Sequence, residues 1–252
     1  MADAINLPER GSAPNDWFAT THWSVVLAVG QSDSAEALGA LERLCRAYWY
    51  PLYVYVRRQG YSTEDAQDLT QGFFQKLLRK DYLAKTDPDK GRFRAFLIAS
   101  LKHYLADQRD WERAAKRGGG RAVLSLDAEE AEDRYRLEPV DSMTPERLYE
   151  RRWALTVLEQ ARHRLRQEFV AAGKIDLYDY LKAVESGDGQ PASYAVAGRR
   201  LGLSEGAIKS AALRLRRRYG ELLRQEISQT VARVSDIDEE IRYLLKVISD
   251  GS

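Results

Sequence analysis

Basic side chains with small and apolar neighbours gather in residues 193–219, whose sequence is SYAVAGRRLGLSEGAIKSAALRLRRRY. Lysine and arginine bind phosphate groups, and side chains between them can reach the base edges in a DNA groove. The only acidic residue of this stretch is Glu205. These residue types suit the binding of DNA, and an ordinary helical hairpin with a solvated basic face is the alternative.

Two helices joined by a tight turn must position these side chains. Tyr194, Ala197 and Leu201 repeat at helical spacing, Gly202 suits the residue that ends a helix, and Ser204 suits the cap of the next one. The side chains expected to be buried are Ile208, Ala211, Ala212, Leu215, Tyr219 and Leu222. The residues expected to meet DNA are Ser204, Lys209, Ser210, Leu213, Arg214 and Arg217. The pattern predicts a helix-turn-helix, whose second helix fits a major groove.

A second basic and aromatic group lies in residues 92–117, which are predicted to form one helix. Aromatic side chains beside arginines can hold unstacked bases against a phosphate backbone. The residues expected to contact nucleic acid are Lys102, His103, Gln108, Arg109, Arg113, Lys116 and Arg117. Phe93 and Leu97 also match a helical core stripe, and burial is the favoured interpretation for these two.

An acidic helix is predicted over residues 64–78, with Ser62 or Thr63 as its cap. Asp65 and Asp68 lie one turn apart, yet no nucleophile or glycine-rich phosphate loop accompanies them, so a solvent or protein-docking face is favoured over catalysis. Glycine in a helix interior costs about 1 kcal/mol relative to alanine. We therefore expect Gly72 to make a close contact.

The whole chain limits the possible classes of protein. Its 252 residues are 44% hydrophobic and 31% charged with a net charge of +1, which describes a folded protein whose basic residues are segregated. The single cysteine excludes an intramolecular disulfide, and the three separated histidines argue against a metal site. The first residues do not resemble a signal peptide, and no apolar run approaches a membrane span, so we expect a cytosolic (cytoplasmic) protein.

Strand signals are almost absent, so the predicted class is all-α: two small helical domains joined by an acidic flexible linker, the C-terminal one a helix-turn-helix. The predicted segments are a flexible leader (1–20), a helical domain (21–120), the linker (121–145), the helix-turn-helix domain (146–227) and a C-terminal extension (228–252). Within them, one helix is expected over 34–50 and another from Pro51.

The C-terminal extension is predicted to contain an amphipathic helix. Residues 235–238 have the spacing of a capping box. The apolar stripe comprises Ile237, Ile241, Leu244, Leu245 and Ile248. Packing of this stripe against its own domain is favoured, and a partner surface is the alternative.

Three motifs taken together resemble the extracytoplasmic-function group of bacterial RNA polymerase sigma factors. These are DAQDLTQ at 65–71, FRAFL at 93–97 and the helix-turn-helix, in the family's order over about residues 35–117 and 146–227. The resemblance implies a transcription initiation factor that binds core RNA polymerase and directs it to promoter DNA, without catalytic activity or a cofactor. An anti-sigma or other regulatory protein is a further possible partner.

The resemblance assigns roles to positions of this chain. Polymerase docking is implied for Asp65, Asp68, Leu69 and Gln71, with Gly72 where the family has glutamate. Reading and melting of the −10 element is implied for Arg92, Phe93, Arg94, Phe96, Lys102, His103, Asp107, Arg109 and Arg113. Phe96 replaces a usual tryptophan and His103 a common asparagine. Reading of the −35 element falls to the residues of the second helix, among which Leu213 replaces a frequent histidine or aromatic residue.

Two other functions stay open from the sequence. A stand-alone helix-turn-helix regulator would explain the C-terminal half but not the motifs at 65–71 and 93–97. A helical adaptor that does not bind DNA would use the acidic and amphipathic faces for protein partners.

Overall fold

The computed structural model describes residues 35–77, 79, 92–114, 128–137, 143–186, 201–231 and 233–250. The leader, the loop expected at 86–91 and the first helix of the predicted helix-turn-helix lie outside these residues. Eight α helices, one short 3-10 helix and no strand occur among the described residues, which confirms the all-α class. Within the same residues, no helix is long and apolar enough to cross a membrane.

The described helices form two compact units, which we treat separately. The first unit comprises Phe18–Thr156 together with Ile227–Ser252, and the second includes Val157–Glu226. The boundaries differ from those of the predicted domains because α7 (Pro145–Ala171) and α10 (Glu205–Thr230) each contribute residues to both units. The C-terminal segment therefore belongs to the same unit as the helices from the first half of the chain.

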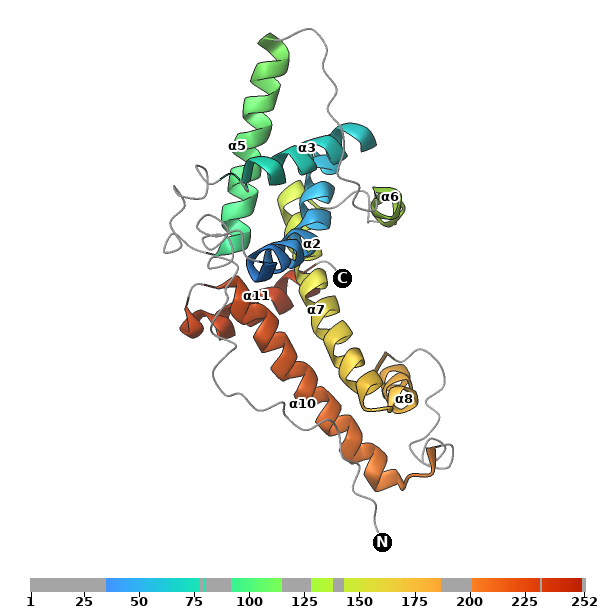
Figure 1. The fold of residues 1–252 in the computed structure, drawn as a ribbon. Coiled ribbons are helices and arrows are strands. Elements are labelled where there is room, and N and C mark those ends of the chain that lie inside the picture. The colour runs from blue at the N-terminus through green and yellow to red at the C-terminus, as the bar shows by residue number, and fades with distance from the viewer. Residues whose placement is uncertain are drawn as a thin grey trace. The chain divides into compact units, whose positions relative to one another are not determined.

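The first unit is built from helices that are distant in sequence (Figure 1). They are α2 (Ala35–Arg58), α3 (Thr63–Leu77), α5 (Phe93–Ala114), α6 (Ala128–Arg136), the start of α7, the 3-10 helix η3 (Val234–Asp236) and α11 (Ile237–Ser249). Its largest fully buried side chains include Tyr48, Tyr53, Phe73, Phe93, Tyr149 and Trp153. Aromatic rings from α2, α3, α5 and α7 thus form the core of this unit.

The prediction of a new helix at Pro51 was wrong, because α2 continues through this residue. An interior proline removes one backbone hydrogen bond and costs about 3 kcal/mol. The residues from Leu52 to Val56 that follow it are all buried, with exposed fractions of 0–3%. Burial of these five large side chains offsets the cost of the proline, so the helix is not interrupted.

The cap of α3 and the contact at its interior glycine are as predicted from the sequence. Ser62 caps the helix, since the backbone N–H of Asp65 donates to its Oγ over 3.1 Å and its hydroxyl donates to the Asp65 carboxylate over 2.7 Å. A Cβ atom at Gly72 would lie 2.5 Å from Oη of Tyr104. The expected close contact is therefore confirmed: α5 approaches α3 at the one position without a side chain.

Part of the predicted linker is a helix fixed to α2. The Glu132 carboxylate of α6 accepts hydrogen bonds from Tyr53 Oη (2.5 Å), Arg57 Nε (3.1 Å) and Arg57 Nη2 (2.9 Å). Burial opposes ionisation of Glu132, yet these hydrogen bonds hold the pKa of its carboxyl below the ordinary value. The Arg57 guanidinium also lies over the Tyr135 ring. Residues 121–127 and 138–142 of the predicted linker lie outside the description.

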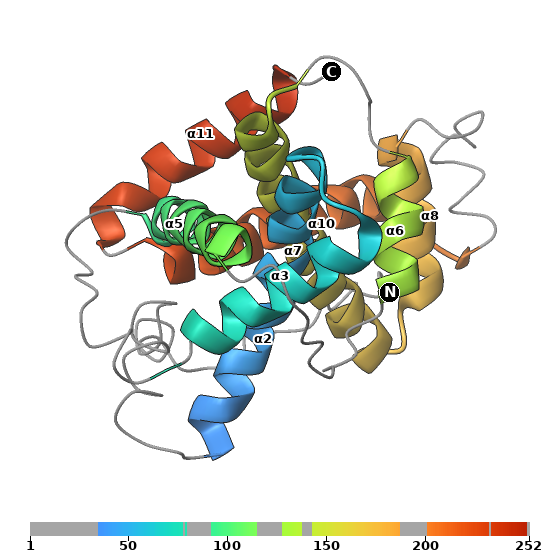
Figure 2. The same cartoon turned by 90° about the horizontal axis from the view of Figure 1, so that it is seen from above.

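The tail helix α11 packs within the first unit, beside the first turn of α5 (Figures 1 and 2). Ile237 and Leu244 are buried as the stripe predicts, whereas Leu245 is half exposed and Glu240 is fully buried. The predicted capping box does not form, because η3 leads into α11 and the helix starts after Asp236 without a side-chain cap. An acidic residue thus takes a core position that the apolar pattern does not assign to it.

The second unit consists of the end of α7, α8 (Ile175–Ser186) and most of α10. Phe169 of α7 packs against Tyr178 of α8, with their ring centroids 5.5 Å apart. From α10, the residues predicted to be buried are buried, except that Tyr219 is half-buried. The predicted orientation of α10 is therefore confirmed.

Replacement of Gly72 by alanine tests the contact between α3 and α5. Alanine is favoured in a helix by about 1 kcal/mol, but crowding against a packed side chain costs about 1–3 kcal/mol. We expect Gly72→Ala to lower the free energy of unfolding measured in urea. In a Tyr104→Phe background, which removes the crowded hydroxyl, the same change should stabilise the protein. A stabilising effect in both backgrounds would contradict the contact.

Replacement of Glu132 by glutamine tests the attachment of α6. Hydrogen bonds to a charged group contribute about 1.5–3 kcal/mol, and we expect a loss of this size at pH 7. Because the folded-state pKa of Glu132 is lowered, its contribution is present above the ordinary value of 4.5 and is lost as the pH falls through the folded-state pKa. Urea titrations at several pH values should show that Glu132→Gln loses less stability in acid than the wild type. Asp133→Asn, at the exposed neighbouring position, is the control and should leave this pH dependence unchanged.

Candidate nucleic-acid interface

A tight turn sets the start of α10 in the second unit. Gly202 has a φ of +66°, the left-handed conformation that glycine adopts without a Cβ clash. Ser204 then caps α10, because its Oγ accepts a hydrogen bond from the backbone N–H of Ala207 over 3.2 Å. The left-handed conformation of Gly202 and the cap at Ser204 are both as predicted from the sequence.

One face of α10 is exposed along its first three turns, and we call it the recognition face. It comprises Lys209, Ser210, Leu213, Arg214 and Arg217, all of them exposed as the helical spacing predicts. Leu213 is 68% exposed and lies between cationic neighbours, where an apolar side chain is not needed for folding. The face therefore offers cations, a hydroxyl group and one apolar side chain to the same partner.

Two cations of the recognition face have acidic neighbours along α10. Lys209 pairs with Glu205 over 2.8 Å, and Arg217 pairs with Glu221 over 3.4 Å. Pairs at this spacing on an exposed helix contribute only about 0.3–0.5 kcal/mol. A phosphate group can therefore replace either carboxylate at little cost.

Arg218, next to the recognition face, has a structural role instead. Its Nε and Nη2 atoms donate to the two oxygens of Glu168 on α7, over 2.9 and 2.7 Å. Its Nη1 atom donates to Glu221 over 3.0 Å. The bonds to Glu168, and to a smaller extent the bond to Glu221, hold the pKa of the Arg218 guanidinium above the ordinary value. Not every arginine of the basic stretch faces outward, and Glu168 is the partner that the sequence did not indicate.

The exposed residues of α5 form a second candidate surface, in the first unit. Lys102 pairs with Glu146 over 2.7 Å, and Asp107 pairs with Lys76 over 3.0 Å. Arg109 donates to Tyr61 Oη over 2.7 Å, and His103 is exposed. Gln108 is half-buried, while the side chain of Arg113 and residues 115–117 lie outside the description. Lys102, His103, Asp107 and Arg109 thus lie on the solvent side of α5, two of them in exposed ion pairs.

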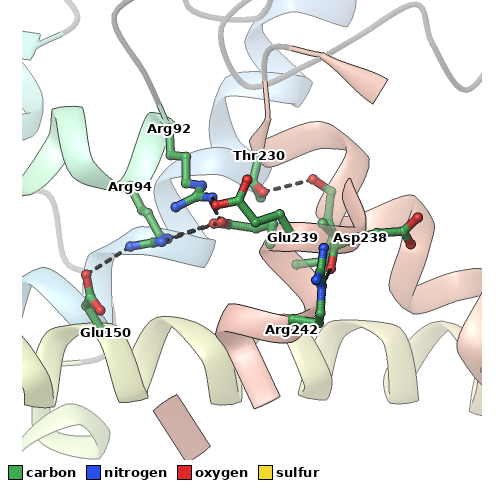
Figure 3. A network of polar contacts seen from close by, with 9 residues as sticks. Arg92, Arg94, Glu150, Thr230, Asp238, Glu239 and Arg242 are labelled. Carbon is green, nitrogen blue, oxygen red and sulfur yellow. Dashed lines mark hydrogen bonds and ion pairs between the residues drawn. The ribbon is translucent and has the colours of Figure 1, made fainter. Parts of the chain in front are cut away.

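The first turn of α5 is different, because Phe93, Arg94 and Leu97 point into the unit. Phe93 and Leu97 are fully buried, as favoured from the sequence, and Phe96 is half-buried. Arg94 is only 4% exposed. Its side chain donates to Glu240 of α11 over 2.7 Å and to Glu150 of α7 over 2.9 Å (Figure 3). The roles of Phe93 and Arg94 toward DNA remain predictions, and in this structure both side chains are covered.

Arg92 and two aromatic rings complete the network around Arg94. Arg92 pairs with Glu239 over 2.7 Å and with Glu240 over 2.6 Å. The Arg94 guanidinium lies 4.1 Å from the ring centroid of Tyr243 and 4.8 Å from that of Trp153. Burial acts to lower the pKa of Arg94, but the hydrogen bond and charge of Glu240 hold it above the ordinary value. Arg94 therefore stays charged inside the unit.

Of the four residues of α3 predicted to dock on a protein partner, only some are exposed. Asp65 and Asp68 are exposed, Gln71 is half-buried and Leu69 is buried at 8% exposure. Asp65 takes part in the helix cap, so its carboxylate already has one partner. Asp68 is the more available of the two carboxylates for a protein partner, while Leu69 supports the helix from the core.

The described residues contain no group of three or more histidine, cysteine, aspartate or glutamate side chains that could hold a metal ion.

The most informative residue that sequence reasoning missed is Glu240. A signal for it exists, because Glu240 lies three residues after Ile237 and four before Leu244, within the apolar stripe itself.

Salt-dependent binding to duplex DNA tests the recognition face. Each phosphate contact contributes a slope of about 0.9 to the dependence of log affinity on log salt concentration. We expect Arg214→Gln to weaken binding to duplexes of any sequence and to reduce this slope by about one contact. Arg166→Gln, which removes an exposed arginine of α7, is the matched control and should keep the wild-type slope. Equal slopes in both variants would contradict a phosphate contact by Arg214.

Comparisons with known proteins identify no relative. No protein-family model matches the chain, no curated protein matches it in sequence, and no solved structure matches it. The function must therefore be argued from the residues and from the geometry of the two units.

Proposed function

We propose that the chain is a promoter-specificity subunit of bacterial RNA polymerase, which binds the core enzyme and directs it to promoter DNA. The proposal places the protein in the cytoplasm and assigns it no catalytic activity of its own. The recognition face would read the upstream promoter element, α5 would act at the downstream element, and the acidic face of α3 would dock on the polymerase.

The observation that carries the proposal is the recognition face on α10. It follows a glycine turn and a serine cap, its opposite side is buried, and its outer residues are cationic or small except for Leu213. A helix with these features fits a major groove, where cations bind phosphates and a few side chains select bases. An exposed leucine among them suits contact with a thymine methyl group.

The first unit adds support for a polymerase-dependent function over simple DNA binding. Asp68 on α3 and the basic and polar side of α5 are exposed in the same unit. A stand-alone regulator needs neither the acidic helix nor the aromatic FRAFL segment. Both follow from a subunit that must hold a polymerase and open a duplex, which is what the resemblance to sigma factors implies.

Run-off transcription with core polymerase, followed by sequencing of the selected promoters, tests the proposal. We expect wild-type protein to produce promoter-dependent transcripts. We expect the double variant Lys209→Glu and Arg214→Glu to reduce them by at least about tenfold, because each lost contact to a base or phosphate costs about 1–3 kcal/mol. Binding to core polymerase in a pull-down should not change.

The control is a charge-matched double variant elsewhere in the second unit, Arg166→Glu with Lys182→Glu, both at exposed positions. It should retain transcription. Wild-type protein that binds duplex DNA but not core polymerase would indicate a stand-alone regulator instead. Unchanged transcription by the Lys209→Glu and Arg214→Glu variant would indicate an adaptor that does not read DNA through this face.

A further inference from the structure

We infer that Glu240 of the tail helix is a positioning residue for promoter opening, because it fixes the first turn of α5 through Arg94. This inference rests on the proposed function. It assigns the C-terminal extension to the part of the protein that opens DNA, and it assigns Arg94 to the support of that part and not to a DNA contact.

The first turn of α5 is held at three points by two other helices. Arg94 Nε donates to Glu240 Oε1 over 2.7 Å, and Arg94 Nη1 donates to Glu150 Oε1 over 2.9 Å. Tyr149 Oη donates to the backbone carbonyl of Arg94 over 2.9 Å. Arg92, just before the helix, pairs with Glu239 and Glu240. Both the main chain and the side chain of Arg94 therefore have fixed positions (Figure 3).

A charged network at this place is better suited to orientation than to stability. Apolar residues of similar volume often stabilise a fold as much as a buried ion pair does, because removal of charges from water is costly. A guanidinium fork that meets carboxylates at defined angles adds geometric specificity that apolar packing lacks. Glu240 itself is fully buried, and Tyr243 of the same helix covers the guanidinium face of Arg94.

The orientation of this turn decides where Phe96 lies. The ring of Phe96 is 6.0 Å from that of buried Phe93, which in turn packs against Tyr48 at 5.4 Å. Phe96 is half-buried, and Ala95 and Ala99 beside it are exposed. An aromatic ring that is partly accessible among small residues can receive an unstacked base. A site of this kind works when its residues are held to within about 0.5 Å.

Promoters that are already open provide the test. The variants are Glu240→Gln, which keeps the shape of the side chain, and Tyr149→Phe, which removes only the hydroxyl bonded to Arg94. Each is assayed as full-length protein with core polymerase on a promoter recovered in the selection above, as a matched duplex and with mismatches across its −10 region. Asp238→Asn is the control, since its exposed carboxylate points away from the two arginines (Figure 3).

We expect both variants to lose at least roughly tenfold in transcription from the duplex and to stay within about twofold of wild type on the mismatched promoter. The control should match wild type on both templates. Helical content and binding to core polymerase should not change, and if Glu240→Gln does not fold, Tyr149→Phe alone decides the outcome.

Each other outcome overturns the inference in a recognisable way. Equal losses on both templates would show a general structural role for the network. A gain on the duplex would show that α11 covers the segment and inhibits it. Wild-type activity on the matched duplex in both variants would show that the turn does not need these bonds. If wild-type protein transcribes from neither template, the proposed function fails and this inference fails with it.

Discussion

The first unit is organised around one buried cation. The Arg94 guanidinium lies almost fully out of water, so its charge must be balanced within the unit. Glu240 and Glu150 supply the negative charge from two different helices, and Tyr243 and Trp153 supply aromatic faces. Because these partners come from α7 and α11, the requirement to neutralise one arginine joins three helices that are far apart in sequence.

The arginines of this chain are of two kinds, according to whether a carboxylate from another helix neutralises them. Arg94, Arg57 and Arg218 each meet carboxylates contributed by another helix. Arg214 and Arg217 point outward from α10 and are exposed, and the acidic neighbour of Arg217 lies one turn further along the same helix. A guanidinium held by a distant element is part of the fold, whereas one with only local neighbours can exchange them for phosphate. This distinction, and not the number of basic residues, defines the candidate interface.

Local patterns predicted local structure well. Gly202 has the left-handed conformation and Ser204 caps α10, the apolar side of α10 is buried, and Gly72 makes the close contact that its position in a helix implies. Each of these depends on residues within a few turns or on one steric requirement. The continuation of α2 through Pro51 was missed because burial by distant helices outweighs the local cost of proline.

Ion pairs between residues far apart in the chain could not be predicted from the sequence. Nothing local to Arg94 indicates that a carboxylate 146 residues later will meet it. Glu240 interrupts an apolar stripe, which marks the position as unusual but does not name its partner. For the same reason, the resemblance implied a DNA contact for Arg94 and the basic stretch that contains Arg218 was expected to favour DNA, while the structure pairs both arginines with acids from other helices. These pairings depend on the tertiary fold alone.

The order of the chain gives this arrangement a consequence during synthesis. The ribosome makes α5 long before α11, and Val157–Glu226 of the second unit is translated between them. Domains generally fold as they emerge, starting from the N-terminus. Until α11 leaves the ribosome, Arg94 lacks its main counter-ion, so the core of the first unit cannot close in its final form. A chain that stops before Glu240 would leave Arg94 with Glu150 as its one remaining described carboxylate partner, which makes synthesis of α11 a condition for a finished first unit.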